Sequence, residues 1–468
     1  MNQIILQILL NYTRKIGEIL SEESFNINTS CPRVESVCID AAREICEEHI
    51  EELNRAFRED KKFRREHGLV LKEKSRKRQI LTALGWMNVS RDCYRDKESG
   101  SYVTPLDQIL GIDKYQRISG AVGAELVTEA TEHSYAESAR IVTDGAVSRQ
   151  SVRNMILKIR VPEKEPAERG KKVSELHVFA DEDHVHMQRP NKEKGKKNQI
   201  VPEVTVTEGI ENVGEGRNRT VNPMHFVDEG FDSKRLWKSV SGYILQAYDL
   251  DEIQKIWVHA DGGNWIRNGL CEFEQTEHVI DRFHFEREMR SINRRFPGKN
   301  TSQSIRAAIE NDDRKRADRI LQKRMNESES KQDLEATRQF GTYLTGHWEE
   351  IRNCIVEQPG GSCTEAIISH MLSERFSRNP MGWSKAGLGR LSAARIYIKN
   401  GGKLTYENFG ESESKERYGD HLEHLLDADG ISASDWSLFE GSPVMIPDQN
   451  SGTQQILRKM GQPTNILS

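Results

Sequence analysis

The spacing of apolar residues changes along the chain, and each change marks a group of expected elements. From Met1 to about Glu66 apolar residues recur three and four positions apart, which predicts amphipathic helices. Residues 80–103 show the shorter alternation and the turn residues of a strand pair. Residues 117–160 return to helical spacing, and the Lys-, Glu- and Pro-rich residues 162–172 predict a linker.

Beyond the linker the pattern becomes that of strands joined by helices. Runs rich in β-branched and aromatic residues predict strands over residues 176–180, 200–207, 221–227, 256–260 and 278–280. The second and third of these flank a Gly- and Asn-rich turn, which predicts an antiparallel meander. Helices are expected over residues 233–247 and 364–376. From Glu286 to about Val356 the chain is helical and rich in arginine, and so long a helical stretch within a mixed domain predicts an insertion.

Residues 135–160 have the spacing of a helix-turn-helix motif. A first helix, a short turn containing glycine and a second helix capped by Ser148 follow one another. The second helix would carry Arg149, Gln150 and Arg153 near its N-terminal end, where base-reading side chains lie in such motifs. Helical hairpins of this kind also occur in proteins that touch no DNA, so the spacing leaves both interpretations open.

Composition narrows the class of protein. The chain has 468 residues, enough for two or three domains that each bury a core. Its seven cysteines include no Cys-x-x-Cys pair, which disfavours a disulfide framework and a zinc finger and suits a reducing cytosol. The apolar run from Ile4 to Leu10 is far shorter than a membrane span.

Basic residues are unevenly distributed. A formal net charge of -5 argues against a uniformly basic nucleic-acid binder. Lysine and arginine nevertheless gather between Arg58 and Arg78, a run that includes Arg76 and Lys77 and that we interpret as helical. Such a run is either a solvated helix face or a set of phosphate contacts.

Carboxylates follow two expected strands and begin a late helix. Asp181 follows the strand at 176–180, Asp261 follows the strand at 256–260, and Glu365 lies in the first turn of the later helix. Strand ends are where α/β sheets hold their sites. Three carboxylates that converge from distant elements would hold two Mg²⁺ ions, with Mn²⁺ as a substitute, for attack on a phosphodiester.

Several alternatives for these residues stay open. Asp183 shares a strand face with Asp181 and could be the first ligand in its place. Glu365 could complete a capping box with Ser362, in which it would bond a backbone amide. His284 could be a core histidine. A zinc site is a further alternative, although no cysteine would join its ligands, His184, His186, Asp281 and His284.

The order of these motifs resembles that of a known family. Four segments in sequence are similar to the DDE transposases of bacterial insertion sequences and mutator-like elements: Asp181-x-x-His184-Val185, Asp261-Gly262, Asp281-x-x-His284 and, after an all-α insertion, Glu365. The sequence also resembles the ISLre type of transposase in four segments: Ala180-Asp181-Glu182-Asp183-His184-Val185, Asp281-Arg282-Phe283-His284, Tyr94-Arg95-Asp96-Lys97 and Asn379-Pro380-Met381-Gly382-Trp383-Ser384-Lys385. The resemblance covers about residues 70–400.

This resemblance implies an α/β ribonuclease-H-like catalytic core. Asp181, Asp261 and Glu365 would be its metal-binding triad, with Asp281 and His284 as an accessory pair and Asp183 beside them. The expected order of parts is a mostly helical N-terminal DNA-binding region at 1–165 with the helix-turn-helix near 135–160, the core at 170–290 and 359–400, the all-α insertion at 290–358, and a tail at 401–468.

The activity implied is that of a DDE transposase, which cleaves and joins double-stranded DNA at the ends of an insertion sequence. Arg149, Gln150 and Arg153 would read the terminal inverted repeats, while the arginine-rich insertion and Arg76, Lys77 and Arg78 would contact phosphates. Trp348 and Trp383 are either core residues or stacking surfaces for an unpaired base.

Two further expectations concern the partners of the protein and the alternatives to a transposase. Bringing two DNA ends together implies at least a dimer, acting in the bacterial cytoplasm at the nucleoid. The alternatives to a transposase are a structure-specific DNA nuclease of the same fold without strand transfer, and a domesticated, non-catalytic DNA-binding protein.

Overall fold

The computed structural model forms two compact units, one containing the residues up to Leu126 together with those from Thr405 onward, and the other containing Val127–Leu404. The boundary lies at residue 126 instead of near 165, so the predicted helix-turn-helix shares a unit with the main sheet. The predicted tail at 401–468 lies outside the described residues from residue 410 onward. The structure describes residues 3–188, 198–214, 217–261, 263–267, 269–360, 363–379 and 381–409.

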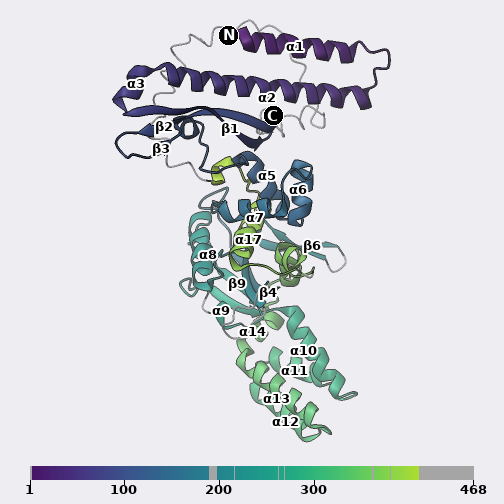
Figure 1. Cartoon of the computed structure of the whole chain (residues 1–468). Coiled ribbons are helices and arrows are strands. Elements are labelled where there is room, and N and C mark those ends of the chain that lie inside the picture. Colours follow the sequence, from purple (N-terminus) through teal and green to yellow (C-terminus); the bar gives the residue numbers. More distant parts are fainter. Residues whose placement is uncertain are drawn as a thin grey trace. The chain divides into compact units, whose positions relative to one another are not determined.

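The first unit combines a helical hairpin with a strand hairpin (Figure 1). Helices α1 (Gln3–Leu20), α2 (Ile27–Glu59) and α3 (Lys61–Glu66) are followed by β1 (Leu69–Thr82), β2 (Gly85–Asp96) and β3 (Tyr102–Val103), then by α4 (Pro105–Ile109) and α5 (Gly120–Ala130). The strands form an antiparallel sheet in the order β1-β2-β3. Strand β2 packs against α2, whose Phe57 contacts the ring of Tyr94 at a centroid distance of 5.7 Å.

The prediction of helix throughout the basic run between Arg58 and Arg78 is wrong, because residues 69–78 belong to β1. This is an edge strand, and its central residues 72–77 are all exposed. Charged side chains are how proteins protect an edge strand from pairing with another chain. The unbroken run of charged and polar residues from Lys72 to Lys77 hid the alternation that a half-buried strand would show.

A buried carboxylate fixes this irregular strand. The register of β1 against β2 shifts twice, between Leu71 and Arg76, and Ser75 has a φ of 50°. The Asp92 carboxylate accepts hydrogen bonds from Ser75 N at 2.9 Å, Arg58 Nε at 2.5 Å and Asn54 Nδ2 at 3.2 Å. Burial raises the pKa of Asp92, but the hydrogen bonds outweigh it and hold the pKa below its ordinary value.

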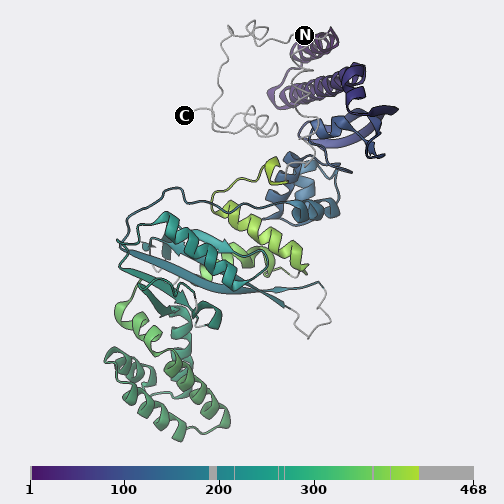
Figure 2. The ribbon, with the colours of Figure 1, turned by 90° about the vertical axis from the view of Figure 1, so that its left-hand side faces the viewer.

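The second unit is built on a mixed sheet, five-stranded among the described residues (Figures 1 and 2). Strands β4 and β5 pair antiparallel, as do β5 and β8, which confirms the meander. Strands β4 and β9 pair in parallel, as do β9 and β10. The strand order is β10-β9-β4-β5-β8, and their bounds are β4 (Glu175–His186), β5 (Asn198–Thr207), β8 (Met224–Val227), β9 (Lys255–Ala260) and β10 (Thr276–Ile280).

A small ribbon interrupts the meander. Strands β6 (Gly209–Gly214) and β7 (Arg217–Val221) pair with each other outside the main sheet. The sequence analysis treated most of this segment as a turn, because glycine and asparagine are depleted in ordinary strands.

Helices cover both faces of the sheet. Helix α8 (Ser233–Ala247), which has the bounds predicted for it, lies along one face of the sheet (Figure 2). Its Leu236, Val240 and Ile244 pack against inward residues of β4, β5 and β9. On the opposite face Phe179 packs against Ile367 of α15 (Thr364–Ile368). The short helix α9 (Asn264–Arg267) follows β9. Among the described residues, no helix is both long and apolar enough to cross a bilayer.

The predicted all-helical insertion is confirmed between β10 and α15. Its core buries Trp348, whose Nε1 donates to Asp312 at 2.7 Å, so this tryptophan is a core residue and not a stacking surface. Trp383 is buried as well, with Nε1 donating to the Phe376 carbonyl at 2.9 Å. The elements are α10 (Arg282–Arg295), α11 (Thr301–Glu310), α12 (Arg314–Asn326), α13 (Lys331–Gly346), α14 (Trp348–Arg352) and η1 (Asn353–Glu357).

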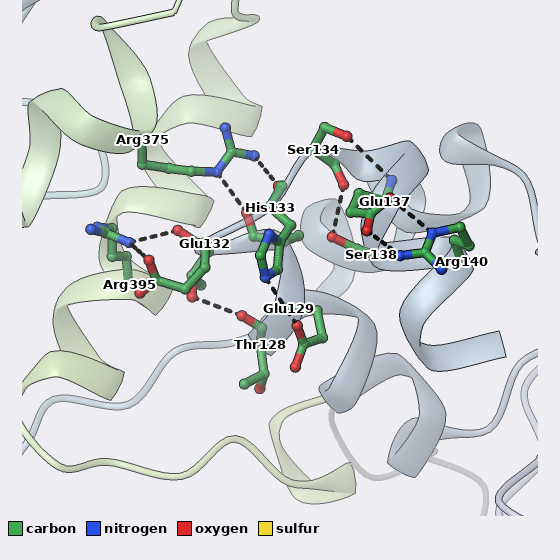
Figure 3. Close-up of polar contacts among 12 residues, drawn as sticks. Thr128, Glu129, Glu132, His133, Ser134, Glu137, Ser138, Arg140, Arg375 and Arg395 are labelled. Carbon is green, nitrogen blue, oxygen red and sulfur yellow. Dashed lines mark hydrogen bonds and ion pairs between the residues drawn. The ribbon is translucent and has the colours of Figure 1, made fainter. Parts of the chain in front are cut away.

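Two buried arginines join the α5–α6 turn to the C-terminal helices (Figure 3). Arg395, on α17 (Lys385–Lys399), donates to the carbonyls of Thr131, Met371 and His370 at 2.6–2.8 Å. Arg375, in α16 (Glu374–Phe376), donates to the carbonyls of Ala130 at 2.9 Å and His133 at 2.7 Å. These carbonyls lie at or just after the end of α5 and within η2 (Ser369–Ser373), a π-turn.

We predict that Arg395→Met lowers the free energy of unfolding by about 3 kcal/mol, because it strips three carbonyls of their donor in a site where the arginine is 1% exposed. Urea unfolding of the full chain measures the change. Arg395 also pairs with Glu132 at 2.7 Å. Lys399→Met is the matched control, since Lys399 pairs with Glu132 too, at 2.9 Å and from the surface, and we expect it to cost under about 1 kcal/mol. Equal losses in the two variants would contradict the proposed anchoring.

Candidate active site beside β4 and β9

Strand register sets Asp181 beside Asp261, although Asp181 lies within β4, which runs on to His186, and not after the end of the strand as predicted. In the parallel pairing of β4 with β9, Phe179 lies opposite His259, and continuing this register by two residues aligns the two aspartates. The rings of Phe179 and His259 stack at 4.6 Å on the sheet face away from α8. Since alternate residues share a face, Asp181 and Asp261 belong to the face that α15 covers.

Helix α15 adds the third predicted acid. Glu365 lies in its first turn with a side chain that is 57% exposed, and its Oε1 is 3.6 Å from Nε2 of His284. The residue that caps α15 is Cys363, which makes no side-chain capping bond, and Ser362 of the alternative capping box lies outside the described residues. The Glu365 carboxylate therefore lies beside the imidazole of His284.

The pKa of Asp181 reflects the presence of the other two acids nearby. Burial, together with the negative charges of Asp261 and Glu365, raises its pKa to about 7. A hydrogen bond from the Glu182 N–H at 2.8 Å and the charge of His284 act in the opposite direction. Asp181 is thus a carboxyl group held among like charges, which is a common property of active sites.

Asp261 stands just after β9 on an exposed turn. Its Oδ1 accepts a hydrogen bond from Gly263 N at 2.9 Å, which fixes the carboxylate close to its own backbone. The predicted sharp turn at Gly262 lies outside the described residues. One oxygen of Asp261 remains for other contacts, since a carboxylate can accept several hydrogen bonds or bind a cation.

Asp281 is a buried cap that positions His284. Its Oδ1 accepts from the backbone N–H of Phe283 at 2.9 Å and of His284 at 3.2 Å, which starts α10, and its Oδ2 accepts from the Thr364 hydroxyl at 2.8 Å. Asp281 therefore joins the helix of His284 to the helix of Glu365. The Asp281 carboxylate, with Oδ1 at 3.3 Å from Nδ1 of His284, raises the pKa of His284.

His284 is not a core histidine, because its side chain is 20% exposed and lies between two carboxylates. The other histidines of the zinc alternative lie elsewhere: His184 is exposed on β4, with Nε2 at 3.5 Å from Glu182, and His186 is exposed two residues further on. The structure brings Asp281 and His284 together and leaves these two apart from them.

Asp183 lies on β4 with different neighbours from Asp181. It is 7% exposed, and burial raises its pKa while the hydroxyls of Ser377 and Ser373 lower it. The segment that follows α15, which carries these two serines, therefore covers Asp183. Of the two candidate first ligands, Asp181 is the one grouped with Asp261 and Glu365.

The donor atoms of these residues suit a divalent cation, but their side chains do not lie close enough together to bind one. Carboxylate oxygens are the ligands that Mg²⁺ prefers, and a cation among Asp181, Asp261 and Glu365 would relieve the repulsion that raises the pKa of Asp181. In the part of the chain that the structure describes, no three acidic, histidine or cysteine side chains are grouped closely enough to hold a metal. To complete a metal site, the exposed Glu365 side chain would have to turn from His284 toward the aspartates.

The predicted DNA-reading residues lie on a helix pair of the expected form. Helix α6 (Tyr135–Thr143) and α7 (Arg149–Lys158) are joined by a turn in which Asp144 has a φ of 50°. Ser148 caps α7 by accepting from Ser151 N at 3.2 Å, as predicted. Arg149 and Gln150 are exposed and Arg153 is half-buried.

The predicted phosphate contacts divide into exposed and paired residues. Arg76 and Lys77 are exposed on β1, whereas Arg78 is half-buried with Nη1 at 3.5 Å from Asp107. Burial lowers the pKa of Arg78. In the insertion Arg295 pairs with Asp333 at 2.7 Å and Arg306 with Glu286 at 2.6 Å, so these arginines serve the packing of helices.

Sequence reasoning missed a recess beside the acids. It lies between α10 and α13, has a volume of about 380 Å³, and is lined by Asp261 and His284 at one end and by residues of the insertion beyond. The sequence signal was slight, because the lining residues Arg287 and Ser291 follow His284 at helical spacing within an otherwise charged helix.

Comparisons with known proteins match most of the chain. A family model described as an uncharacterised protein family, UPF0236, matches residues 20–413. Two UPF0236 proteins of Caldanaerobacter subterraneus subsp. tengcongensis are 32% and 31% identical over 416 residues, which is 88% of this chain and 86% of each relative. A protein of Streptococcus gallolyticus, named for the vanSb 3′ region, is 24% identical over 345 residues, 69% of this chain and 73% of its own length.

We predict that Asp181→Asn stabilises the protein in the presence of a chelator. The raised pKa means that the folded state keeps a proton that the unfolded chain, with its ordinary value of 3.8, has lost. Stability should therefore fall as pH rises from about 4 to 7, and the asparagine variant should gain about 1–3 kcal/mol at about pH 8 and less at about pH 5. Thermal unfolding at the two pH values measures this.

The control for this comparison is Asp318→Asn, at an exposed position on α12. We expect its effect to be small and equal at both pH values. A gain in Asp181→Asn that does not depend on pH would show that the carboxyl is not held protonated.

Proposed function

The chain belongs to UPF0236, an uncharacterised family, and from the acids gathered on its sheet we propose that it is a metal-dependent DNA transposase of the DDE type. The observation that carries the proposal is that Asp261 and Glu365 lie near enough to Asp181 to raise the pKa of its carboxyl. Carboxylates from the middle of β4, from the end of β9 and from one helix would, on closure around cations, supply the ligands that two-metal phosphodiester chemistry needs.

We further propose that the sheet is a ribonuclease-H-like core. Three antiparallel strands in chain order, β4, β5 and β8, are continued on the other side of β4 by the parallel strands β9 and β10. The first and fourth strands in this order carry the two aspartates, and a helix after the insertion carries the glutamate. This combination of strand order and acid placement supports the assignment.

The residues of the site would divide the work as follows. Asp181, Asp261 and Glu365 would hold Mg²⁺ or Mn²⁺, which when bound would activate the attacking oxygen and neutralise charge on the leaving oxygen. His284, held by Asp281, stands at the edge of this group within reach of Glu365. A protonated His284 would attract the DNA phosphate and keep Glu365 in the site.

DNA contacts would come from the helix pair and the edge strand. Arg149, Gln150 and Arg153 at the start of α7 would read base edges of the terminal inverted repeat, and the exposed Arg76 and Lys77 would contact phosphates. Two ends must meet for joining, so we propose an assembly of at least two copies, in the bacterial cytoplasm at the nucleoid.

The relatives offer independent support. The name of one Caldanaerobacter protein joins eleven locus designations, and another joins four. Repeated copies of one gene within a genome are what a mobile element produces. Terminal inverted repeats bordered by a short target duplication around this gene would add to that support.

We predict that purified protein with Mg²⁺ joins a labelled element end to target DNA, and that Asp261→Ala lowers the rate at least about 1000-fold, because loss of one carboxylate disrupts the metal site. Joined products resolved on a denaturing gel measure the rate. Asp183→Asn is the matched control, an acid two residues from Asp181 on the same strand, and we expect it to retain most of the rate.

The products discriminate between the transposase and its rivals. Cleavage without joining would favour a structure-specific nuclease. DNA binding without cleavage, unaltered in Asp261→Ala, would favour a non-catalytic DNA-binding protein. Equal losses in Asp183→Asn and Asp261→Ala would refute the assignment of the triad.

We predict two different effects on DNA binding. Arg149→Ala should cost about 1–3 kcal/mol on the element end and relax its discrimination from unrelated DNA, because it removes a base contact. Lys77→Ala should weaken binding to all sequences and reduce the salt dependence by about one unit of slope. Fluorescence anisotropy over a series of salt concentrations measures both. Uniform weakening by Arg149→Ala would contradict base reading by α7.

A further inference from the structure

The first helix has two apolar sides, and only one of them is covered by described residues. One side of α1 packs on α2 and buries Ile8 and Ile19 (Figure 1). Another side carries residues spaced three or four positions apart, which places them in one row along the helix. This row, called the Leu6 face, consists of Leu6, Leu9, Thr13, Gly17 and Leu20, all of which are exposed.

Exposed apolar side chains are concentrated on this helix and the turn that follows it. Of the seventeen large apolar side chains that are exposed among the described residues, seven lie between residues 4 and 27. Single exposed leucines are ordinary on a protein surface, but several in one row mark a surface that another molecule covers. The Leu6 face is therefore a candidate interface.

The Leu6 face is suited to burial in an apolar contact. Its one hydroxyl is already satisfied, because Thr13 Oγ1 donates to the Leu9 carbonyl at 2.8 Å. Thr13 can therefore enter an interface without leaving a polar group unpaired. The row contains no charged residue, so two copies of it would meet without repulsion between like charges.

The spacing of the Leu6 face is symmetric about Thr13. Leu6 and Leu20 each lie seven residues from Thr13, and Leu9 and Gly17 each lie four residues from it. A two-fold axis at Thr13 would set Leu6 against Leu20 of a second copy, and Leu9 against Gly17. A contact of this kind uses the same surface on both copies, so it is self-complementary.

Gly17 provides the space that a leucine from a second copy would fill. Glycine in the middle of a helix is destabilising relative to alanine, so its presence in α1 calls for a reason. Within the part of the chain that the structure describes, a Cβ on Gly17 would meet nothing within 4 Å. An antiparallel pair places Leu9 in this space, whereas a parallel pair would set glycine against glycine and leave a gap.

We propose that α1 pairs antiparallel with α1 of a second copy of this chain through the Leu6 face, and that the pair forms without DNA. A helix with one apolar side on its hairpin partner and a second side open is typical of four-helix bundles, and two α1–α2 hairpins supply four helices. The inference goes beyond the proposed function, which asks for at least two copies but assigns no surface to them. It uses residues of the first unit alone and does not depend on the acids.

The first test measures the mass of the full chain without DNA, by sedimentation velocity at several micromolar concentrations. We expect the wild-type protein to have the mass of two chains. Leu6→Glu should raise the dissociation constant at least about 100-fold, because symmetry buries the new carboxylate twice. Asn11→Glu is the matched control, since it adds the same charge at an exposed position of α1 outside the Leu6 face, and it should leave the mass unchanged.

The second test exchanges the large and small residues of the pair. Gly17→Leu should raise the dissociation constant about tenfold or more through a clash with Leu9, and Leu9→Ala should raise it about tenfold by leaving a hole. The double variant Leu9→Ala/Gly17→Leu should return it to within about threefold of wild type, because large again meets small across the axis. Within one chain the two positions lie about two helical turns apart, so they do not compensate each other there.

Four results would overturn the inference: a single-chain mass for the wild-type protein at every concentration, unchanged association in Leu6→Glu, no recovery in the double variant, or tighter association in Gly17→Leu. Circular dichroism establishes that each variant is folded. If Leu6→Glu is not folded, the exchange of Leu9 and Gly17 decides.

Other coverings of the Leu6 face give different results. If a further segment of the same chain covers it, Leu6→Glu lowers the unfolding temperature without changing the mass. If a lipid surface covers it, the wild-type chain sediments with phosphatidylcholine vesicles and Leu6→Glu does not. Either result would overturn the inference. The joining assay with Asp261→Ala tests the proposed function separately, so one of the two can fail while the other stands.

Discussion

The parallel register of β4, β9 and β10 is the constraint on which the candidate site depends. Backbone hydrogen bonds align Phe179 with His259 and Ala260 with Ile280, so Asp181, Asp261 and Asp281 follow at one level across three neighbouring strands. A shift of one residue would turn Asp261 toward the apolar face that α8 covers. The buried residues that precede each aspartate therefore determine where its carboxylate lies.

Asp181, Asp261 and Asp281 lie at one level of the sheet but have different surroundings, and they differ in role for that reason. Asp281 receives two backbone N–H groups and a hydroxyl, so its charge is satisfied inside the protein. Asp181 receives one backbone N–H and faces two other acids, and its pKa rises to about 7. A carboxylate that the fold leaves uncompensated is one that gains from a cation, whereas a compensated one serves as a support.

The sequence was sufficient where a local pattern and the tertiary environment agree. The bounds of α8, the cap at Ser148 and the strand that precedes Asp261 followed from periodicity and capping rules, whereas β4 runs past its predicted end at residue 180 to His186. Prediction from the sequence failed where the tertiary environment determines the local structure. The basic strand β1 is exposed along its centre and shows no alternation, and the choice between Asp181 and Asp183 depends on which helix each one meets. The recess required α10 and α13 to be placed together, which no spacing within either helix predicts.

The buried arginines connect the site to the helix pair that would read DNA. Helix α15 carries Glu365 and continues into the π-turn η2, whose carbonyls at His370 and Met371 are held by Arg395. The same guanidinium holds the Thr131 carbonyl, a few residues before α6. Because these bonds are geometrically specific and buried, a displacement of α6 would be resisted at η2. The position of the helix that carries Glu365 is thus tied, through one side chain, to the turn that precedes α6.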